Sequence, residues 1–242
     1  MSAISEEERV LRFLESVKNP GSHDELPAGE LDGVRLVRMA DVQRERVDWL
    51  WRGYIARGKL HIIDGDPGLG KSTATSDFAA RVTVGGSWPD GQAGSDPAGV
   101  VLLSAEDGLG DTIRPRLEAA GADLTRVAAL TGITARDEET GETYERMPSL
   151  PRDIPRIRQA VERVGAALVI IDPLMAYLGG DVNSHRDQDV RRALAPLAKM
   201  AEETGAAVIL VRHNTKGGGS NAVYRGGGSI GSIGAARLGF TL

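Results

Sequence analysis

A glycine-rich run that ends in lysine and serine constrains this chain more than any other segment: Gly65-Asp66-Pro67-Gly68-Leu69-Gly70-Lys71-Ser72. It matches the pattern G-x-x-x-x-G-K-[ST], in which successive backbone N–H groups form a cradle for phosphate oxygens. Glycine suits such a turn because some positions need a positive φ and because a Cβ would block the phosphate. We expect Lys71 to contact the β- and γ-phosphates and the Ser72 hydroxyl to reach a Mg²⁺ ion.

The segments on either side of this run, which we call the P-loop, supply the context that a nucleotide site requires. Residues 59–64 before it are mostly apolar and predict a short strand, whereas residues 72–84 after it have apolar side chains at helical spacing. Strand, loop and helix in this order predict ATP binding, with the positive end of the helix dipole beside the phosphates. The expected nucleotide-binding residues are Gly65, Asp66, Pro67, Gly68, Leu69, Gly70, Lys71, Ser72 and Thr73.

The composition limits the class of protein. A chain of 242 residues that is 41% hydrophobic can bury one sizeable α/β core. Its formal net charge of −5 argues against a surface coated for nucleic acid, but not against a local basic loop. The chain has no cysteine, which excludes disulfides and thiolate metal sites. Since no apolar N-terminal run and no stretch of membrane-spanning length is present, we expect a soluble, cytoplasmic protein.

Three further apolar runs, at residues 100–103, 167–171 and 207–211, are typical of buried parallel strands. The second run ends in Asp172, which gives it the form of a Walker B segment. An acid at this point can face the P-loop and hold a Mg²⁺-bound water, so we expect Ser72 and Asp172 to form the metal site. An aspartate that merely caps a loop is the alternative. Helical spacing between residues 190 and 201 predicts a helix before the last of these strands.

The N-terminal part differs in character from the rest of the chain. We predict a helix at residues 5–17, a linker rich in proline, glycine and charge at 19–33, and a short edge strand at 34–37. The expected organisation is an N-terminal helix and linker over residues 1–48, followed by the core over 49–242. Aromatic side chains near the start of the core could stack on a nucleotide base, but a hydrophobic lid packed on the core is favoured. They are Trp49, Trp51 and Tyr54.

The C-terminal part is dominated by glycine from residue 217 onward, which predicts a flexible region. Residues 235–242 then predict a final strand. Because the chain stops directly after this strand, we expect a core truncated at its C-terminus or one that belongs to a larger protein. The polar stretch at residues 131–147 predicts a long excursion or a hairpin.

Five motifs in a fixed order resemble those of the RecA-like ATPases, especially the branch of plasmid RepA hexameric helicases and phage or plasmid AAA-type ATPases. The resemblance covers about residues 49–242. It implies a RecA-like P-loop NTPase core, an α/β fold with a mostly parallel sheet and helices on both faces. It also implies that the strand at 207–211 is inserted between the P-loop strand and the Walker B strand. The motifs are the P-loop, Ser-Ala-Glu-Asp with Thr-Ile-Arg-Pro-Arg-Leu, Ile-Ile-Asp-Pro, Val-Arg-His-Asn-Thr-Lys and Arg-Gly-Gly-Gly-Ser.

The resemblance further implies roles for two residues at strand ends. Glu106 looks like the glutamate that polarises the attacking water, a task for which a carboxylate in line with the γ-phosphate is suited. Its neighbour Asp107 is the rival candidate, and a solvated acidic turn is the other alternative. His213 resembles the family's sensor of the γ-phosphate, with a surface histidine as the alternative.

Arg225 resembles an arginine finger that one subunit offers to its neighbour, because a guanidinium suits the spread charge of the transition state. Lys216 and Arg237 are rivals for this role. The segment between residues 213 and 225 has Lys216 as its one basic residue, which is little charge for a loop that grips DNA. The expected catalytic residues are Lys71, Glu106, Asp172, His213 and Arg225.

The sequence therefore predicts an ATP-hydrolysing motor that uses ATP and Mg²⁺. By analogy it would be a homo-oligomer, namely a hexamer, that acts on single-stranded DNA as a helicase or translocase in replication or repair. One alternative is an ATP-switched assembly or regulatory protein of the same fold without unwinding activity. The other is a P-loop kinase for a small molecule, against which Glu106 and the candidate finger argue.

Overall fold

The computed structural model describes residues 8, 10–11, 29–31, 34–137, 139–213 and 234–241. The chain divides into two compact units, Met1–Arg46 and Val47–Leu242. Nearly all of the helix predicted at residues 5–17 lies outside the described residues, as do Lys216 and Arg225. Among the helices that are described, none is long and apolar enough to cross a membrane.

The first unit contains a small antiparallel pair of strands, β1 (Gly29–Leu31) and β2 (Val34–Leu36), followed by the 3₁₀ helix η1 (Met39–Asp41). β2 confirms the predicted edge strand. β1 lies inside the predicted linker, so the linker prediction is wrong over these residues. The sequence Asp-Gly at 32–33 is a strong short-range signal for a hairpin, and the surrounding proline and charge obscured it.

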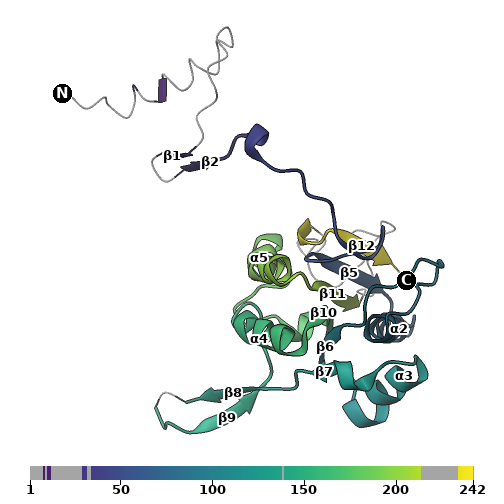
Figure 1. Ribbon diagram of the computed structural model, residues 1–242. Coiled ribbons are helices and arrows are strands. Elements are labelled where there is room, and N and C mark those ends of the chain that lie inside the picture. The colour runs from purple at the N-terminus through teal and green to yellow at the C-terminus, as the bar shows by residue number, and fades with distance from the viewer. Residues whose placement is uncertain are drawn as a thin grey trace. The chain divides into compact units, whose positions relative to one another are not determined.

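The second unit is built on a parallel sheet of six strands in the order β12-β5-β11-β10-β6-β7 (Figure 1). β11 lies between the P-loop strand β5 and the Walker B strand β10, which confirms the predicted insertion. The last strand, β12, confirms the strand expected near the C-terminus. The strands are β5 (Leu60–Gly65), β6 (Gly99–Ser104), β7 (Val127–Ala129), β10 (Ala166–Asp172), β11 (Ala207–His213) and β12 (Leu238–Thr241).

Helices cover both faces of this sheet, as Figure 1 shows. Successive side chains of a strand point to opposite faces, so Val169 and Ile171 of β10 join one apolar cluster and Leu168 and Ile170 the other. The first cluster includes side chains of α4 and α5, and the second includes side chains of α2 and α3. This is the predicted RecA-like core. The helices are α2 (Lys71–Val84), α3 (Arg114–Ala119), α4 (Ile154–Val164) and α5 (Asp187–Thr204), with the π-helical turn η2 (Leu109–Ile113) and the 3₁₀ helices η3 (Leu124–Arg126) and η4 (Leu174–Tyr177).

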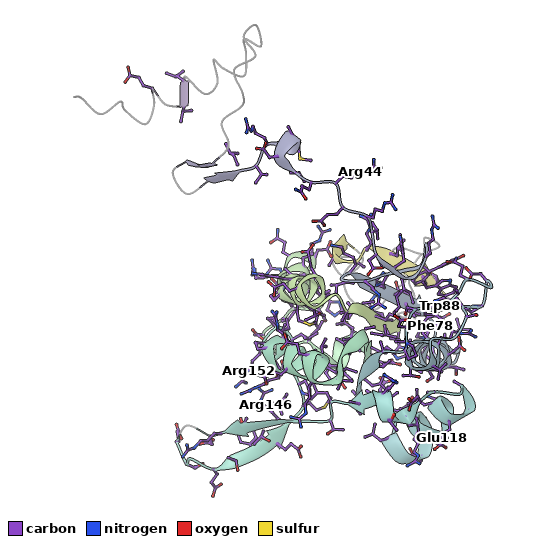
Figure 2. All side chains as sticks on the ribbon, in the orientation of Figure 1. Arg44, Phe78, Trp88, Glu118, Arg146 and Arg152 are labelled. Atoms are coloured by element: carbon purple, nitrogen blue, oxygen red, sulfur yellow. The ribbon has the colours of Figure 1, made fainter. Side chains whose placement is uncertain are left out.

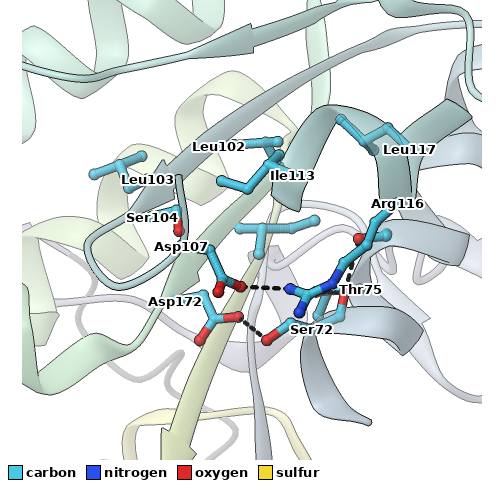
Figure 3. A pocket seen from close by; sticks show the side chains of 12 residues that line it. Ser72, Thr75, Leu102, Leu103, Ser104, Asp107, Ile113, Arg116, Leu117 and Asp172 are labelled. Carbon is cyan, nitrogen blue, oxygen red and sulfur yellow. Dashed lines mark hydrogen bonds and ion pairs between the residues drawn. The ribbon is translucent and has the colours of Figure 1, made fainter. Parts of the chain in front are cut away.

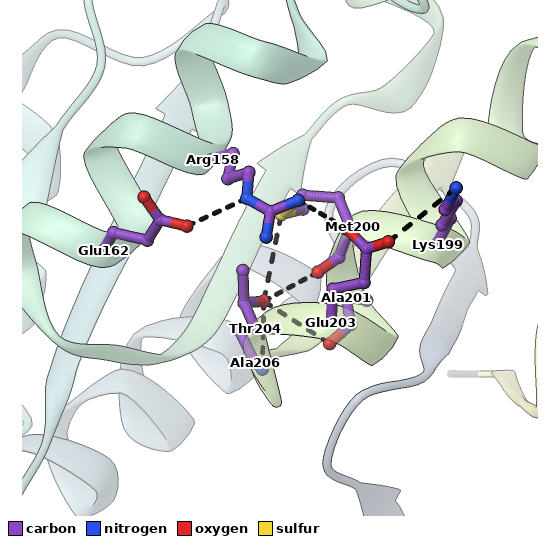
Figure 4. Close-up of polar contacts among 8 residues, drawn as sticks. All are labelled: Arg158, Glu162, Lys199, Met200, Ala201, Glu203, Thr204 and Ala206. Carbon is purple, nitrogen blue, oxygen red and sulfur yellow. Dashed lines mark hydrogen bonds and ion pairs between the residues drawn. The ribbon is translucent and has the colours of Figure 1, made fainter.

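Polar contacts tie α4 to α5 at the surface (Figure 4). Arg158 of α4 donates to Glu162 one turn later, at 2.8 Å, and also pairs with Glu203 of α5. Near the end of α5, the Thr204 hydroxyl donates to the Met200 carbonyl at 2.8 Å. Of these contacts, the Arg158–Glu203 pair joins the two helices, and the other two lie within one helix each.

Two small antiparallel sheets complete the second unit. β8 (Ile133–Arg136) and β9 (Thr143–Arg146) form a hairpin, which confirms the second of the two predicted possibilities for this stretch. β3 (Trp49–Trp51) pairs with β4 (Ile55–Ala56). The ring of Trp51 stacks on Trp88 at 4.9 Å and meets Phe78 of α2 edge-on at 5.6 Å. Figure 2 labels Phe78 and Trp88 side by side, and their packing against Trp51 confirms for Trp51 the predicted packing on the core.

Candidate nucleotide-binding site

The P-loop connects the end of β5 directly to the start of α2. Gly68 and Gly70 have φ angles of 85° and 84°, a left-handed conformation that glycine adopts without strain. A Cβ placed at either glycine would meet no described atom within 4 Å beyond the glycine and its own chain neighbours. Residues 66–70 are all exposed. The loop therefore presents its backbone to an approaching ligand, as phosphate binding requires.

Lys71 is the first residue of α2, and its side chain folds back over the loop. Its ammonium donates hydrogen bonds to the carbonyl oxygens of Gly65 at 2.8 Å and Asp66 at 2.9 Å. The residue is buried, and this burial lowers the pKa of Lys71, while the nearby carboxylates of Asp172 and Asp66 act in the opposite direction. The positive charge thus lies at the loop, held by neutral acceptors.

Ser72 and Asp172 converge from two elements that lie 100 residues apart in the sequence. The Ser72 hydroxyl, in the first turn of α2, donates to Asp172 Oδ2 at the end of β10, at 2.8 Å (Figure 3). Burial raises the pKa of Asp172, and the hydrogen bond from Ser72 and the charge of His213 counteract this rise. A hydroxyl and a carboxylate oxygen are ligands that suit Mg²⁺, which usually takes one or two protein ligands together with water and phosphate oxygens. The residues present therefore fit such an ion.

The rest of the described chain offers no cluster of three or more His, Asp or Glu side chains that could hold a metal. A dedicated all-protein cage is not the usual form of a magnesium site in a nucleotide-binding protein. Ser72 and Asp172 therefore stay the residues predicted to hold the ion.

Glu106 and His213 meet at the same edge of the sheet. β6 ends at Ser104, which is in register with Asp172, and His213 at the end of β11 is in register with Gly65. His213 Nε2 lies 3.4 Å from Glu106 Oε2, and the Glu106 side chain is 62% exposed. Glu106 is thus a solvent-accessible carboxylate held beside the P-loop.

Asp107 has different surroundings from its neighbour Glu106. It forms an ion pair with Arg116 of α3, and both side chains line a cavity of about 30 Å³ next to Ser72 and Asp172 (Figure 3). An aspartate engaged by arginine is a poorer candidate for a free base than an exposed glutamate. Arg116 was not predicted as a site residue, although it belongs to the Thr-Ile-Arg-Pro-Arg-Leu motif.

Thr73 and Arg237 are two further described residues that the sequence singles out. Thr73 is exposed in the first turn of α2. The backbone N–H of Arg237 donates to Leu60 O at 2.8 Å, at the opposite end of β5 from the P-loop. Arg225 and Lys216 lie outside the described residues. The roles predicted for these residues stay predictions.

Comparison with known proteins agrees with this geometry. A family model described as an AAA domain matches residues 26–219. The DNA repair protein RadA of Halalkalibacterium halodurans is 26% identical over 181 residues, which are 74% of this chain and 33% of the relative. RadA of Bacillus subtilis is 26% identical over 168 residues (69% and 30%), and RadA of Mycobacterium tuberculosis 28% over 176 residues (72% and 31%).

The chain spans about a third of the length of these curated relatives. Neither the family model nor the relatives single out the RepA branch. The domain match covers well over half of the chain, however, and it coincides with a P-loop and a parallel sheet in the expected strand order. The chain belongs to the AAA domain family and is a RecA-like P-loop ATPase.

Proposed function

We propose that this protein is an ATP-hydrolysing motor that acts on DNA as a helicase or translocase. The observation that carries the proposal is the convergence of three groups at one edge of the sheet. These are the buried Lys71 ammonium, the hydrogen-bonded Ser72 and Asp172, and the Glu106 carboxylate beside His213. An ammonium, a pair of oxygen ligands and an exposed carboxylate are what in-line phosphoryl transfer to water needs.

Each side chain has a task in this proposal. Lys71 exchanges its two carbonyl acceptors for β- and γ-phosphate oxygens. Ser72 and Asp172 hold Mg²⁺, which when bound neutralises charge on the phosphates. Glu106 accepts a hydrogen bond from the attacking water and aligns it. His213, which contacts Glu106, reports the presence of the γ-phosphate.

The DNA step rests on the relatives and on the family resemblance. The RadA proteins are named as DNA repair proteins. The likeness covers about a third of the length of these relatives. Unwinding or translocation by this chain is therefore proposed by analogy with the family. We also propose a hexamer in which Arg225 of one subunit approaches the nucleotide of the next, with single-stranded DNA as the partner.

ATP turnover with and without single-stranded DNA tests the proposal. Lys71→Ala should abolish turnover, and Glu106→Gln should bind ATP normally but turn over about a hundredfold more slowly, the usual effect of a positioned base. Glu142→Gln, on the exposed β9 side of the hairpin loop, is a matched control that should turn over like the parent. Equal rates in the parent and Glu106→Gln would refute the assignment of Glu106.

A second measurement separates the motor from the alternatives. Strand displacement or DNA-stimulated turnover supports the motor. ATP turnover that DNA does not change, with no displacement, would favour an assembly or regulatory ATPase. A phosphorylated small-molecule product would instead favour a kinase.

A further inference from the structure

A buried ion pair joins the P-loop strand to the strand that ends in His213. Arg212 of β11 donates from Nε to Asp64 Oδ1 and from Nη2 to Asp64 Oδ2 of β5, each at 2.7 Å. The two side chains are 1% and 7% exposed. Arg212 and Asp64 are also direct partners in the register of the two strands.

A contribution to the stability of the fold does not by itself explain why an ion pair is buried here. β5 and β11 are interior strands, flanked on both sides, and the side chains along them are otherwise largely apolar and buried. Removing two charges from water is costly, and apolar residues of similar volume often replace a buried ion pair without loss of stability. What the pair adds is geometry, because the planar guanidinium fork fits a carboxylate in one orientation.

Each partner immediately precedes a residue of the candidate site. Asp64 precedes Gly65, whose carbonyl accepts the hydrogen bond from Lys71. Arg212 precedes His213, which contacts Glu106. Gly65 and His213 are themselves in register, one step beyond the ion pair. A slip of β11 against β5 would therefore move the histidine relative to the P-loop.

We propose that Asp64 and Arg212 form a positioning pair, which holds His213, and through it Glu106, in register with the P-loop. Neither residue touches the reacting atoms in this proposal. It deepens the proposed function, since it rests on the roles given to Glu106 and His213. The two-point fork resists sliding along the strands, which a single hydrogen bond would resist less.

The first test removes both charges at once. Asp64→Leu with Arg212→Met should keep the urea midpoint at or above that of the parent. It should lower kcat for ATP at least about tenfold, with KM within about twofold, because a 1 Å misplacement can cost on the order of a hundredfold in rate. In a His213→Ala background the same double change should lower kcat little further. A stably folded double variant with the parent's kcat would overturn the proposal.

A conservative variant keeps the proposal testable if the double variant does not fold. Arg212→Lys keeps the charge but loses the fork, and should lower kcat in the same direction. Its matched control is Arg146→Lys in a second bidentate pair of the core, in which Arg146 donates to Asp153 at 2.6 and 2.7 Å between the hairpin and α4. That control should lower the urea midpoint and leave kcat unchanged. A similar kcat in both variants would count against positioning.

A spectroscopic measurement separates failure of the proposal from failure of the proposed function. The imidazole proton signals of His213 should shift when Glu106→Gln is introduced into the parent, because the two side chains are in contact. In the Arg212→Lys background the same change should shift them much less. A parent without ATPase activity would refute the proposed function, and this comparison would still support or overturn the positioning pair.

Discussion

A buried histidine at the start of the P-loop strand should make the fold sensitive to mild acid. His61 is fully buried in β5, and its Nε2 accepts a hydrogen bond from the backbone N–H of Ala56 at 2.9 Å. An imidazole nitrogen that accepts a hydrogen bond is unprotonated. Burial, which disfavours the charged form, lowers the pKa of His61 from 6.5 to about 4.

The sign of the effect follows from which state takes up the proton. Between pH 6.5 and about 4 the unfolded chain protonates this histidine and the folded chain does not, so the free energy of unfolding falls as the pH falls. The stabilising contribution is complete above pH 6.5 and is lost toward pH 4. At about 1.4 kcal/mol per pH unit, the difference corresponds to about 3 kcal/mol. That is a large part of the roughly 5–15 kcal/mol that stabilise a typical domain.

Urea unfolding of the parent and of His61→Gln at several pH values between 7 and 4.5 measures this contribution of His61 to the free energy of unfolding. Glutamine can accept the hydrogen bond from the Ala56 N–H but does not titrate. Over this pH range the free energy of unfolding of the variant should therefore fall by about 2–3 kcal/mol less than that of the parent. The comparison is needed because the raised pKa of Asp172 gives a pH dependence of the opposite sign. His185→Gln changes an exposed histidine and should follow the parent. Parallel curves for the parent and His61→Gln would refute the reasoning.

Three further predictions concern the site and its surroundings. Ser72→Ala removes one of the two side chains proposed to hold Mg²⁺, so half-maximal ATP turnover should need on the order of tenfold more Mg²⁺; an unchanged requirement in a Mg²⁺ titration would contradict the metal site. Arg225→Ala should cut turnover about a thousandfold with ATP affinity intact, and mixing it with Glu106→Gln should restore part of the activity, whereas a strictly monomeric enzyme would show no recovery. Trp51→Ala should lower the free energy of unfolding by about 3 kcal/mol, measured in urea, and leave ATP affinity unchanged; weaker ATP binding at equal stability would indicate base stacking instead.

The fold could be predicted largely because its signals are local. Apolar runs and helical spacing mark the strands and helices of the core, and α2 ends where the spacing predicts, at Val84. The place of β11 between β5 and β10 was predicted from the family resemblance, since spacing along the chain does not reveal strand order. β1 could not be predicted in this way, because a three-residue strand is too short to show a periodic pattern.

The contacts within the site were less predictable than its members. Lys71, Ser72 and Asp172 belong to motifs whose chemistry demands them. Asp64 and Arg212 lie 148 residues apart and look, in the sequence, like polar ends of two apolar strands. Their pairing depends on the register of β5 against β11, which tertiary structure sets. Charges at the ends of buried strands are therefore worth testing as partners whenever the strand order is known.

The contacts that the site residues make with one another bear on which ligand the site can select. Lys71 is held by two neutral carbonyls, Ser72 by Asp172, and Glu106 by His213. Each contact that a ligand forms with these side chains replaces one that already exists. The ligand therefore gains affinity only by the free energy by which its own contacts exceed those that they replace. Charged phosphate oxygens exceed neutral carbonyls as acceptors for an ammonium, because attraction between opposite charges adds to the hydrogen bond. In the hydroxyl-carboxylate bond the carboxylate is the charged partner, and a divalent cation attracts that carboxylate more strongly than the neutral hydroxyl does. Discrimination in favour of Mg²⁺-bound nucleotide over free nucleotide should therefore arise at Ser72 and Asp172 rather than at Lys71.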